Sequence, residues 1–206
     1  DGIVGGTTEL GAVTINSASD VTADAAFDAA SIRQVAGSGT TTFSGAVDTS
    51  AAAGIEVDGT NFDFDNSVTL ALGDLDVDAS GTVRFNGQVT TSDTSNGLAT
   101  ISNGGVLTQT ATGDFVLEGA FLQDGAGTVS TAGDVTTTDD NITYSSAVTL
   151  TGPVALDSGA GTGTIAFNDT LDGTQTLGLT AGTGNIDFDG IVGGTTELGA
   201  VTINSA

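Results

Sequence analysis

Carboxylates are the side chains of this sequence that could do chemistry, and several occur in closely spaced groups. Asp63 and Asp65 flank Phe64, and Asp187 and Asp189 flank Phe188 in the same way. A third group, Asp74, Asp76 and Asp78, alternates with apolar residues in DLDVD. Because alternate residues of a strand point to the same face, each group would place its carboxylates together on an outer face. Such oxygens suit a hard cation like Ca²⁺, and paired carboxylates can serve glycoside hydrolysis.

The surrounding sequence favours neither chemistry. The spacing of an EF-hand and the GGxGxDx repeat of calcium-binding β-rolls are both missing. The chain has no His and no Lys, and Arg33 and Arg84 are its only basic residues. We therefore predict no enzyme, with no catalytic, cofactor-binding or metal-ligand residue. The simpler interpretation is a solvated acidic face that opposes lateral pairing of sheets, with Ca²⁺ binding as the alternative.

The overall charge excludes several kinds of partner. Twenty-six acidic residues against two basic ones give a net charge of −24. This charge opposes binding to nucleic acid and to anionic lipid. The chain has no cysteine, which excludes disulfides and thiolate metal sites, and no apolar run long enough to predict a membrane span.

Threonines form a further set of short rows. These are Thr40/Thr42, Thr108/Thr110/Thr112 and Thr136 to Thr138. Aligned along one flat face, they would resemble an ice-binding surface. Because they do not recur in a regular way, the ordinary preference of Thr for strands explains them better.

A short repeat organises the whole chain. Its anchor positions are Ala23, Phe43, Phe64, Phe85, Leu117, Tyr144, Phe167 and Phe188. Apolar residues recur two positions before most anchors and four positions after them, and these three columns contain all nine Phe and the single Tyr. The spacing around an anchor is that of a strand followed by a bend, and a second alternating pair and a Gly-rich turn usually follow.

One such unit cannot bury its apolar face alone, but stacked units can. We therefore predict an all-β parallel β-solenoid (β-helix), right-handed by the general rule for crossovers. It would have about eight coils per long repeat and rise roughly 38 Å, with one continuous interior stack of Phe and Tyr. The two longest spacings between anchors predict long loops at Thr90 to Gly105 and Asp124 to Asp140.

Two other structures compete with this prediction. Tandem immunoglobulin-like sandwiches also consist of short alternating strands, although their strands pair as antiparallel hairpins. Residues 21–37 could form an amphipathic helix with Val21, Ala25, Ala29 and Ile32 on one face. We favour strands there, because Val21 and Phe27 also fall in the columns of the short repeat.

A much longer repeat encloses the short one. Asp1 to Ala18, DGIVGGTTELGAVTINSA, recurs letter for letter from Asp189 to Ala206. Residues 1–188 are thus one long repeat, and 189–206 begin the next identical copy. We expect the chain to be a segment of a longer protein in which neighbouring copies meet end to end.

Segments such as AGSGTTTFSGAVDTSAAAGIEV and LTAGTGNIDFDGIVGGTTELGAVTINSA resemble giant bacterial surface and secreted proteins built from tandem β-strand repeats, the filamentous-haemagglutinin-like adhesins and related filament proteins. The resemblance extends over nearly the whole chain and consists of a general sequence pattern, G-x-hydrophobic-x-F-x-G-x-V. It implies a β-helical shaft at the bacterial cell surface, acting in adhesion, biofilm or filament formation and meeting host or matrix surfaces. The alternative function is a ligand- or calcium-binding module that acts through the long loops and acidic clusters.

Overall fold

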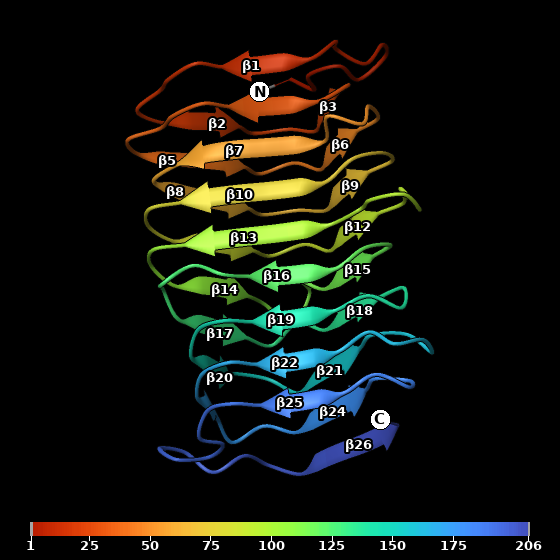
Figure 1. Ribbon diagram of the computed structural model, residues 1–206. Coiled ribbons are helices and arrows are strands. Elements are labelled where there is room, and N and C mark those ends of the chain that lie inside the picture. The colour runs from red at the N-terminus through yellow and green to blue at the C-terminus, as the bar shows by residue number, and fades with distance from the viewer. Residues whose placement is uncertain (1, 206) are drawn as a thin grey trace.

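The computed structural model describes residues 2–205, which fold into a column of stacked turns made of three parallel sheets (Figure 1). Sheet I contains, in spatial order, β1 (Val13–Ile15), β4 (Ile32–Gln34), β7 (Ile55–Gly59), β10 (Leu75–Ala79), β13 (Ala99–Asn103), β16 (Phe121–Gln123), β19 (Ile142–Tyr144), β22 (Ile165–Phe167) and β25 (Ile186–Phe188). Sheet II contains β2 (Val21–Ala23), β5 (Thr40–Phe43), β8 (Asn61–Phe64), β11 (Val83–Phe85), β14 (Leu107–Gln109), β17 (Val129–Thr131), β20 (Val148–Leu150) and β23 (Leu171–Asp172). Sheet III contains β3 (Phe27–Ala29), β6 (Val47–Thr49), β9 (Val68–Leu70), β12 (Val89–Thr91), β15 (Phe115–Leu117), β18 (Val135–Thr137), β21 (Val154–Asp157), β24 (Leu177–Thr180) and β26 (Val201–Ser205).

Each turn of the column passes through sheet I, then sheet II, then sheet III, and each strand pairs in parallel with the equivalent strand one turn away. In Figure 1 the strands of sheet I run to the left at the front, and the chain returns to the right behind them as it descends, which makes the coil right-handed. The parallel β-solenoid is therefore confirmed. An immunoglobulin-like sandwich is excluded for the described residues, since its strands would pair antiparallel.

The possible helix at residues 21–37 is also replaced by strands, namely β2, β3 and β4. Val21 pairs with Thr41 of the next turn, and Phe27 pairs with Val47. These pairings supply backbone partners from the neighbouring turn, so a local amphipathic pattern does not decide the structure. Within residues 2–205, no helix is long and apolar enough to cross a membrane.

The core lies inside the column, where alternate residues of every strand point inward. Strand β10 illustrates the rule, because Leu75, Val77 and Ala79 are buried while Asp76 and Asp78 face solvent. Parallel pairing without a register shift places like residues above one another in most turns, as Leu75 lies beside Ile55 and Ala99. Since neighbouring strands lie about 4.8 Å apart, these residues form continuous apolar ladders along the axis.

An unbroken aromatic stack runs through this core, as expected. Phe43, Phe64 and Phe85 stack face to face, with ring centroids 5.5 and 4.9 Å apart and planes within 11°. Tyr144, Phe167 and Phe188 stack in the same manner at 5.5 Å. The two sets are joined by Phe115 and Phe121, whose rings meet edge to face at 5.1 Å.

The anchors, however, do not all occupy one sheet, which corrects the sequence alignment of the eight units. The first four, from Ala23 to Phe85, lie in sheet II, while Leu117 lies in sheet III. The last three lie in sheet I. The residue that pairs with Phe85 in the next turn is Gln109, which the aromatic pattern could not reveal.

The same correction removes the two long loops. Residues 90–105 include the end of β12 and all of β13, and residues 124–140 include β17 and β18. The two long spacings between anchors each contain a whole turn and a third of the next, because the anchor moves to another sheet. The described chain completes about nine turns, and the two extra thirds of a turn bring the 188-residue repeat from the expected eight coils to about eight and two-thirds.

The short repeat proves to be a corner motif. In the first four turns the anchor ends a strand of sheet II, and the apolar residue four positions later lies in sheet III. After Tyr144 the same spacing leads from sheet I to Val148 of sheet II. A Cβ atom at Gly87 or Gly190 would lie 2.2 Å from a backbone carbon of the previous turn, so these two bends require glycine, whereas Asn66 and Asp169 hold the same place one turn earlier.

Candidate functional site

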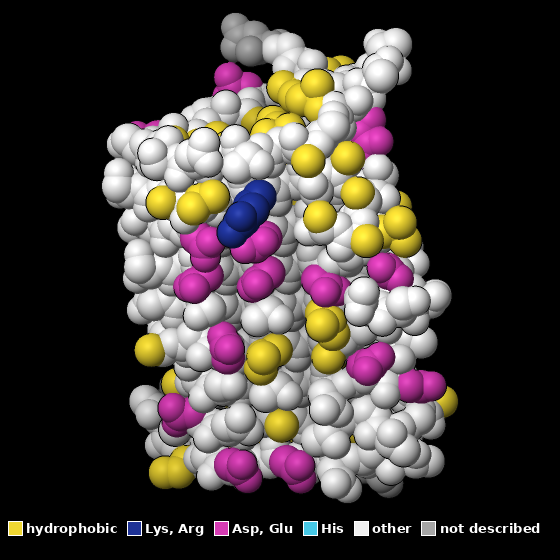
Figure 2. Space-filling view, turned by 45° about the horizontal axis from the view of Figure 1, so that its top comes forward, with side chains coloured by type: hydrophobic (Ala, Val, Ile, Leu, Met, Phe, Trp, Pro, Cys, Tyr) yellow, Lys and Arg dark blue, Asp and Glu magenta, His cyan; other side chains and the backbone are white. Residues whose placement is uncertain are grey.

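The largest gathering of carboxylates lies on the outer face of sheet I. Glu56 and Asp58 of β7 pair in register with Asp76 and Asp78 of β10. Asp124 completes the rim of a shallow surface hollow over these strands. Figure 2 shows acidic side chains grouped on this side of the column below a basic one. The sequence predicted Asp76 and Asp78 as one acidic row, and parallel stacking adds a second row beside it.

The electrostatics of this face are unfavourable for folding. Burial raises the pKa of Asp76 above the usual range, and the charges of Glu56, Asp58, Asp78 and Asp124 raise it further. Like charges on adjacent strands repel, because the strands are only about 4.8 Å apart. The third member of the predicted row, Asp74, has a different role, since its Oδ1 accepts a hydrogen bond from the backbone N–H of Leu98 at 2.9 Å.

Both arginines lie against acidic residues of the next or previous turn. Arg33 pairs with Glu56 at 3.2 Å at one edge of the acidic face, and Arg84 approaches Asp65 at 3.8 Å. About half of each arginine side chain is exposed. Exposed ion pairs of this kind contribute little to stability, so the arginines mainly reduce local repulsion.

The two acidic pairs that flank aromatic anchors do not form a common site. Asp63 lies on sheet II, where burial raises its pKa and Arg84 partly opposes the shift. Asp187 lies on sheet I at the other end of the column, opposite Ala166. Asp65 and Asp189 follow their strands at corners. The structure thus separates Asp63/Asp65 from Asp187/Asp189 by several turns and a change of face.

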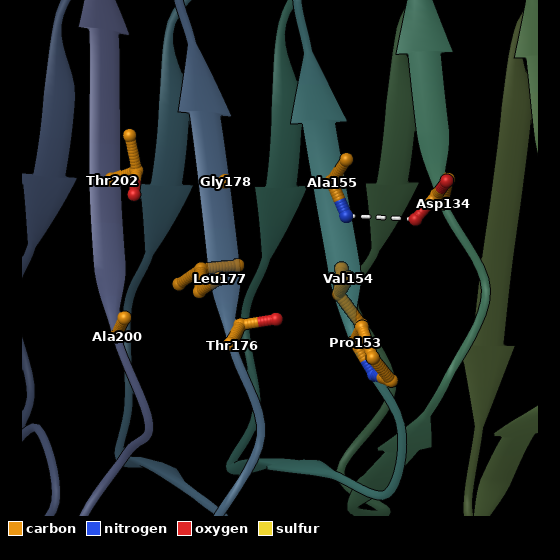
Figure 3. Close-up of a pocket in the computed structure, with 9 residues that line it drawn as sticks. All are labelled: Asp134, Pro153, Val154, Ala155, Thr176, Leu177, Gly178, Ala200 and Thr202. Carbon is orange, nitrogen blue, oxygen red and sulfur yellow. Dashed lines mark hydrogen bonds between the residues drawn. The ribbon is translucent and has the colours of Figure 1, made fainter.

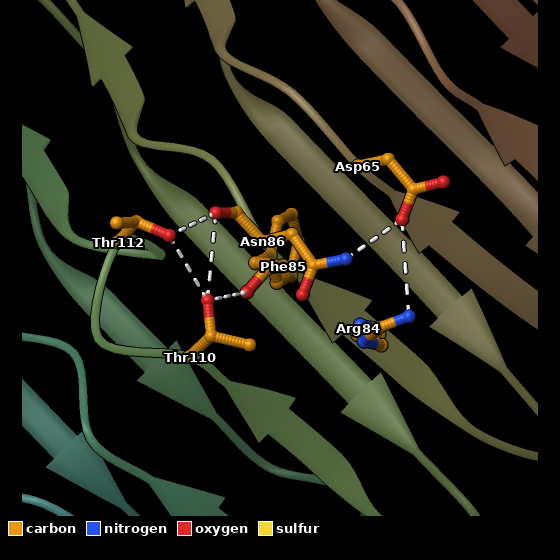
Figure 4. Close-up of polar contacts among 6 residues, drawn as sticks. All are labelled: Asp65, Arg84, Phe85, Asn86, Thr110 and Thr112. Carbon is orange, nitrogen blue, oxygen red and sulfur yellow. Dashed lines mark hydrogen bonds and ion pairs between the residues drawn. The ribbon is translucent and has the colours of Figure 1, made fainter.

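The threonine rows are not one flat face either. Thr108 lies on β14, but Thr110 and Thr112 lie at the following corner, where both hydroxyls donate to the backbone carbonyl of Asn86 (Figure 4). Thr137 points inward and donates to the carbonyl of Asp140 at 2.6 Å. These hydroxyls satisfy backbone groups at corners and do not form an ordered outer array.

A role of the acidic residues that the sequence did not reveal is found at the beginning of the strands. At six corners an Asp or Asn side chain accepts a hydrogen bond from a backbone N–H of the following turn, at 2.7 to 2.9 Å. The pairs are Asp20 with Thr40, Asn61 with Thr82, Asp74 with Leu98, Asp114 with Asp134, Asp134 with Ala155, and Asn141 with Thr164. In each pair the two residues lie opposite each other in register. The signal was present in the sequence as an Asp or Asn immediately before an apolar strand.

Two further carboxylates each accept hydrogen bonds from two backbone N–H groups. The Asp93 side chain accepts from the N–H groups of Gly73 and Ser95, and these hydrogen bonds lower its pKa below the usual range. Asp172 accepts from Thr196 and Thr195, and its pKa is lowered for the same reason. A carboxylate used in this way stabilises the turn and is less available to a ligand.

Inside the column, a small set of polar side chains interrupts the apolar ladders. The Gln123 amide donates to Asn103 Oδ1 at 2.8 Å, and Asn103 in turn donates to the carbonyl of Gly105 at 2.7 Å. The Tyr144 hydroxyl donates to Gln109 Oε1 at 3.3 Å. Burial raises the pKa of Tyr144, so the hydroxyl stays protonated and can donate. These groups satisfy one another within the core and are closed to solvent.

Taken together, the polar groups act as structural supports of the column. Across residues 2–205, no group of three acidic side chains is arranged to hold a metal ion. No protein-family model, no curated protein and no solved structure matches the chain. The most repeated chemical arrangement among the described residues is the contact between one turn and the next.

Proposed function

We propose that the chain is a structural shaft of an extracellular bacterial adhesin or surface filament, built from tandem copies of this solenoid repeat. Its partners are neighbouring copies of the same repeat, joined end to end. At its tip, such a shaft would hold a binding region against a host or matrix surface. The resemblance of the sequence to large repeat adhesins supports this setting, and the column supports the mechanical role.

The observation that carries the proposal is the position of the second copy of the repeated segment. Its residues Val201–Ser205 form β26, which pairs in parallel with Leu177–Thr180 of β24, in register from Val201 to Ile203 and with an irregularity before Ser205. The beginning of the next copy thus continues the existing column with a bridge in sheet II and a strand in sheet III. Repetition of the sequence therefore translates into added length.

The end of the column favours such growth. Val201 and Ile203 point toward the axis but are 43% and 55% exposed, because no further turn covers them. Leu198 packs against the core from the same turn. Covering such side chains removes apolar surface from water and stabilises the assembly by about 25 cal/mol per Å². An additional turn would also pair the free backbone groups of β26.

The sides of the column oppose growth in other directions. The carboxylates lie on the outer faces and at the corners, and the net charge is −24. Two such columns repel when they approach side by side. Association along the axis is therefore favoured over lateral aggregation, as a long thin shaft requires.

The mechanical part of the proposal is tested by measuring length against copy number. Chains with one, two and three long repeats should lengthen by about 42 Å per copy, the rise of eight and two-thirds turns at about 4.8 Å each. Small-angle X-ray scattering or electron microscopy measures this length. Chains that grow in diameter and not in length would overturn the proposal.

A matched pair of variants shows whether stacking causes the lengthening. In the two-copy chain, Val201→Asp with Ile203→Asp places charge in the core and should separate the copies into two short rods. Thr202→Asp, on the outer side of the same strand, should leave one long rod.

The cellular part is tested with antibodies raised against the folded chain. They should label intact cells of the bacterium that produces it, and gold-labelled antibody should decorate extended structures. Labelling that requires permeabilised cells would overturn the surface location while leaving the length measurement intact.

A further inference from the structure

The two copies of the repeated segment have the same sequence but lie in different sheets. In the first copy, Val13–Ile15 forms β1 of sheet I and pairs with β4. In the second, the same three residues, Val201 to Ile203, lie in β26 of sheet III and pair with β24. The preceding valine differs in the same way, since Val4 bridges to Phe27 of sheet III, whereas Val192 bridges to Leu171 of sheet II.

The local conformation is nonetheless common to both copies. Gly5 and its equivalent Gly193 both have a positive φ, of 77° and 68°. What differs is the part of the column beside the GGTT turn, residues 5–8 and 193–196, which follows the valine. In the first copy it lies over sheet III beside Asp28, and in the second it crosses the corner from sheet II to sheet III, held by the carboxylate of Asp172. The segment is therefore a unit that fits at more than one corner.

The displacement follows from counting strand positions along the chain. From β1 to β26, with the bridge at Val192 counted as a position of sheet II, the chain advances by 26 strand positions. Three positions make one turn, so 188 residues correspond to eight and two-thirds turns. A long repeat therefore does not end on the sheet where it began.

We infer that each copy of the repeat docks on the previous one turned by one third of a turn, so that tandem copies form a threefold screw. A strand sequence found in sheet I of one copy is found in sheet III of the next and in sheet II of the third. This inference rests on the proposed stacking of repeat on repeat and specifies its geometry.

The consequence is a rotating surface. The acidic face formed by Glu56, Asp58, Asp76 and Asp78 would turn by 120° from one copy to the next. Its repulsion is then distributed around the shaft and is not aligned along one side. The same face returns to the same side after three copies, or 26 turns, about 125 Å along the axis. A partner that recognises one face would find its sites at this spacing.

The corner motif explains why the fold tolerates this displacement. The four-residue spacing from an anchor to the next apolar core residue already operates at all three corners within one copy, from Phe43 to Val47, from Leu117 to Phe121 and from Tyr144 to Val148. A strand that forms in one sheet can therefore form in another. A repeat therefore need not contain a whole number of turns for its strands to pair with the turn before.

Engineered cysteine pairs test the inference in the chain as it is, which has no cysteine of its own. Thr202 lies directly beside Gly178 on the outer face of sheet III, in a row with Ala155 (Figure 3). A Cβ atom added at Gly178 meets only ordinary contacts. Gly178→Cys with Thr202→Cys should therefore crosslink on oxidation or with dibromobimane, which fluoresces when it bridges two thiols.

The competing arrangement has its own pair. If the second copy kept the sheet of the first, Thr202 would lie on sheet I beside Asp187 of β25. Asp187→Cys with Thr202→Cys should not crosslink in our structure, and its crosslinking would overturn the inference. Failure of the 178/202 pair in the folded chain would do the same. Glu56→Cys with Asp76→Cys, opposite each other on the outer face of sheet I and away from both ends of the column, is the positive control for ladder pairs.

The first copy is tested in parallel. Thr14→Cys should crosslink with Arg33→Cys of sheet I and not with Asp28→Cys of sheet III. The 178/202 and 187/202 pairs are then repeated in a chain with two full copies, where the second copy is covered by further turns. If the 187/202 pair crosslinks in that chain and the 178/202 pair does not, the threefold screw arrangement is overturned. The increase of length with copy number would survive that result, so the two proposals fail separately.

Discussion

Two stretches of the aromatic stack have the same geometry although they belong to different sheets. Phe43, Phe64 and Phe85 stack within sheet II, and Tyr144, Phe167 and Phe188 stack within sheet I. In both stretches neighbouring ring planes lie within 11° of each other. The rings between them turn edge to face as the stack crosses the interior.

The two stretches differ in sheet but not in ring geometry. Contact between rings along the axis therefore determines the geometry of the stack, and the sheet to which each ring belongs does not. Offset stacked and edge-to-face arrangements are both favourable for aromatic rings at these distances. The stack can therefore move from one wall of the column to another without a break. Gln109 follows Phe85 in its row of sheet II, and Gln123 precedes Tyr144 in its row of sheet I, so each polar side chain occupies a ring position in a turn where the stack changes wall.

The largest effect should come from removing one ring in each stretch. Phe64→Ala and Phe167→Ala both empty a fully buried site and should each lower the free energy of unfolding by about 3–5 kcal/mol. Denaturant titration with an unchanged slope measures the loss. Phe64→Leu and Phe167→Leu, which retain most of the volume, are the matched controls and should cost less. A loss confined to Phe64→Ala would show that the sheet II stretch alone supports the core.

The crossing region should respond to loss of a hydrogen bond. Tyr144→Phe leaves Gln109 Oε1 without its donor in the core and should cost about 1–3 kcal/mol. Gln109→Leu alone should be similarly unfavourable, because it strands the Tyr144 hydroxyl. The double variant should recover the part of the loss that comes from this pair, while the carbonyl of Gly113, which accepts from the Gln109 amide at 3.3 Å, remains without that donor. Additive losses in the double-mutant cycle would mean that the two side chains do not act as a pair.

A smaller effect is expected at the corners. Asp114→Ala removes the acceptor of the Asp134 N–H and should cost about 0.5–1.5 kcal/mol. Asp114→Asn is the matched control, because Asn61 and Asn141 fill the same role at other corners with an amide oxygen. It should retain most of the stability. Equal losses in the two variants would identify charge, and not the hydrogen bond, as the source of the effect.

The smallest effects should appear in the pH dependence of stability, through carboxylates on the outer faces. The raised pKa of Asp76 means that its ionisation opposes folding, so stability is lost as pH rises through that pKa. Asp76→Asn should therefore raise the unfolding midpoint at pH 7 and have no effect in acid below the ordinary aspartate pKa. High salt should reduce the gain.

Asp172 should behave in the opposite sense. Its pKa is lowered by backbone hydrogen bonds, so its contribution is present above the ordinary pKa and is lost as pH falls through the lowered value. Asp172→Asn should lower the midpoint at pH 7, and the difference from the parent chain should vanish in acid. A change of the same sign in both variants would contradict these assignments.

Most of the architecture could be predicted from residue spacing. The columns of Phe and Val around each anchor require strands that bend and stack, and the parallel solenoid with one aromatic stack follows from that requirement. The register of the first turns was also correct, as Phe43, Phe64 and Phe85 show. The assignment failed after Phe85, because Gln109 occupies the next anchor position and carries no apolar signal.

The polar groups were less predictable, because their roles depend on the neighbouring turn. Asp74 and Asp76 look alike in the sequence, yet one binds a backbone N–H and the other lies in a repulsive row. The opposite residue in a neighbouring turn decides between these outcomes, Leu98 of the next turn for Asp74 and Glu56 of the previous turn for Asp76. That residue lies about twenty positions away, and its identity depends on the length of every corner between.

The sequence by itself determined the strands, the inward alternation, the glycines at the bends and the repetition of a stacking unit, since all of these depend on contacts among near neighbours and on period. Only the tertiary structure decided which sheet each strand joins. A strand joins a sheet through the backbone groups of the turn before it, and three equivalent corners accept the same motif. This is why an identical stretch, Val13–Ile15 and again Val201 to Ile203, lies in sheet I at one end of the column and in sheet III at the other.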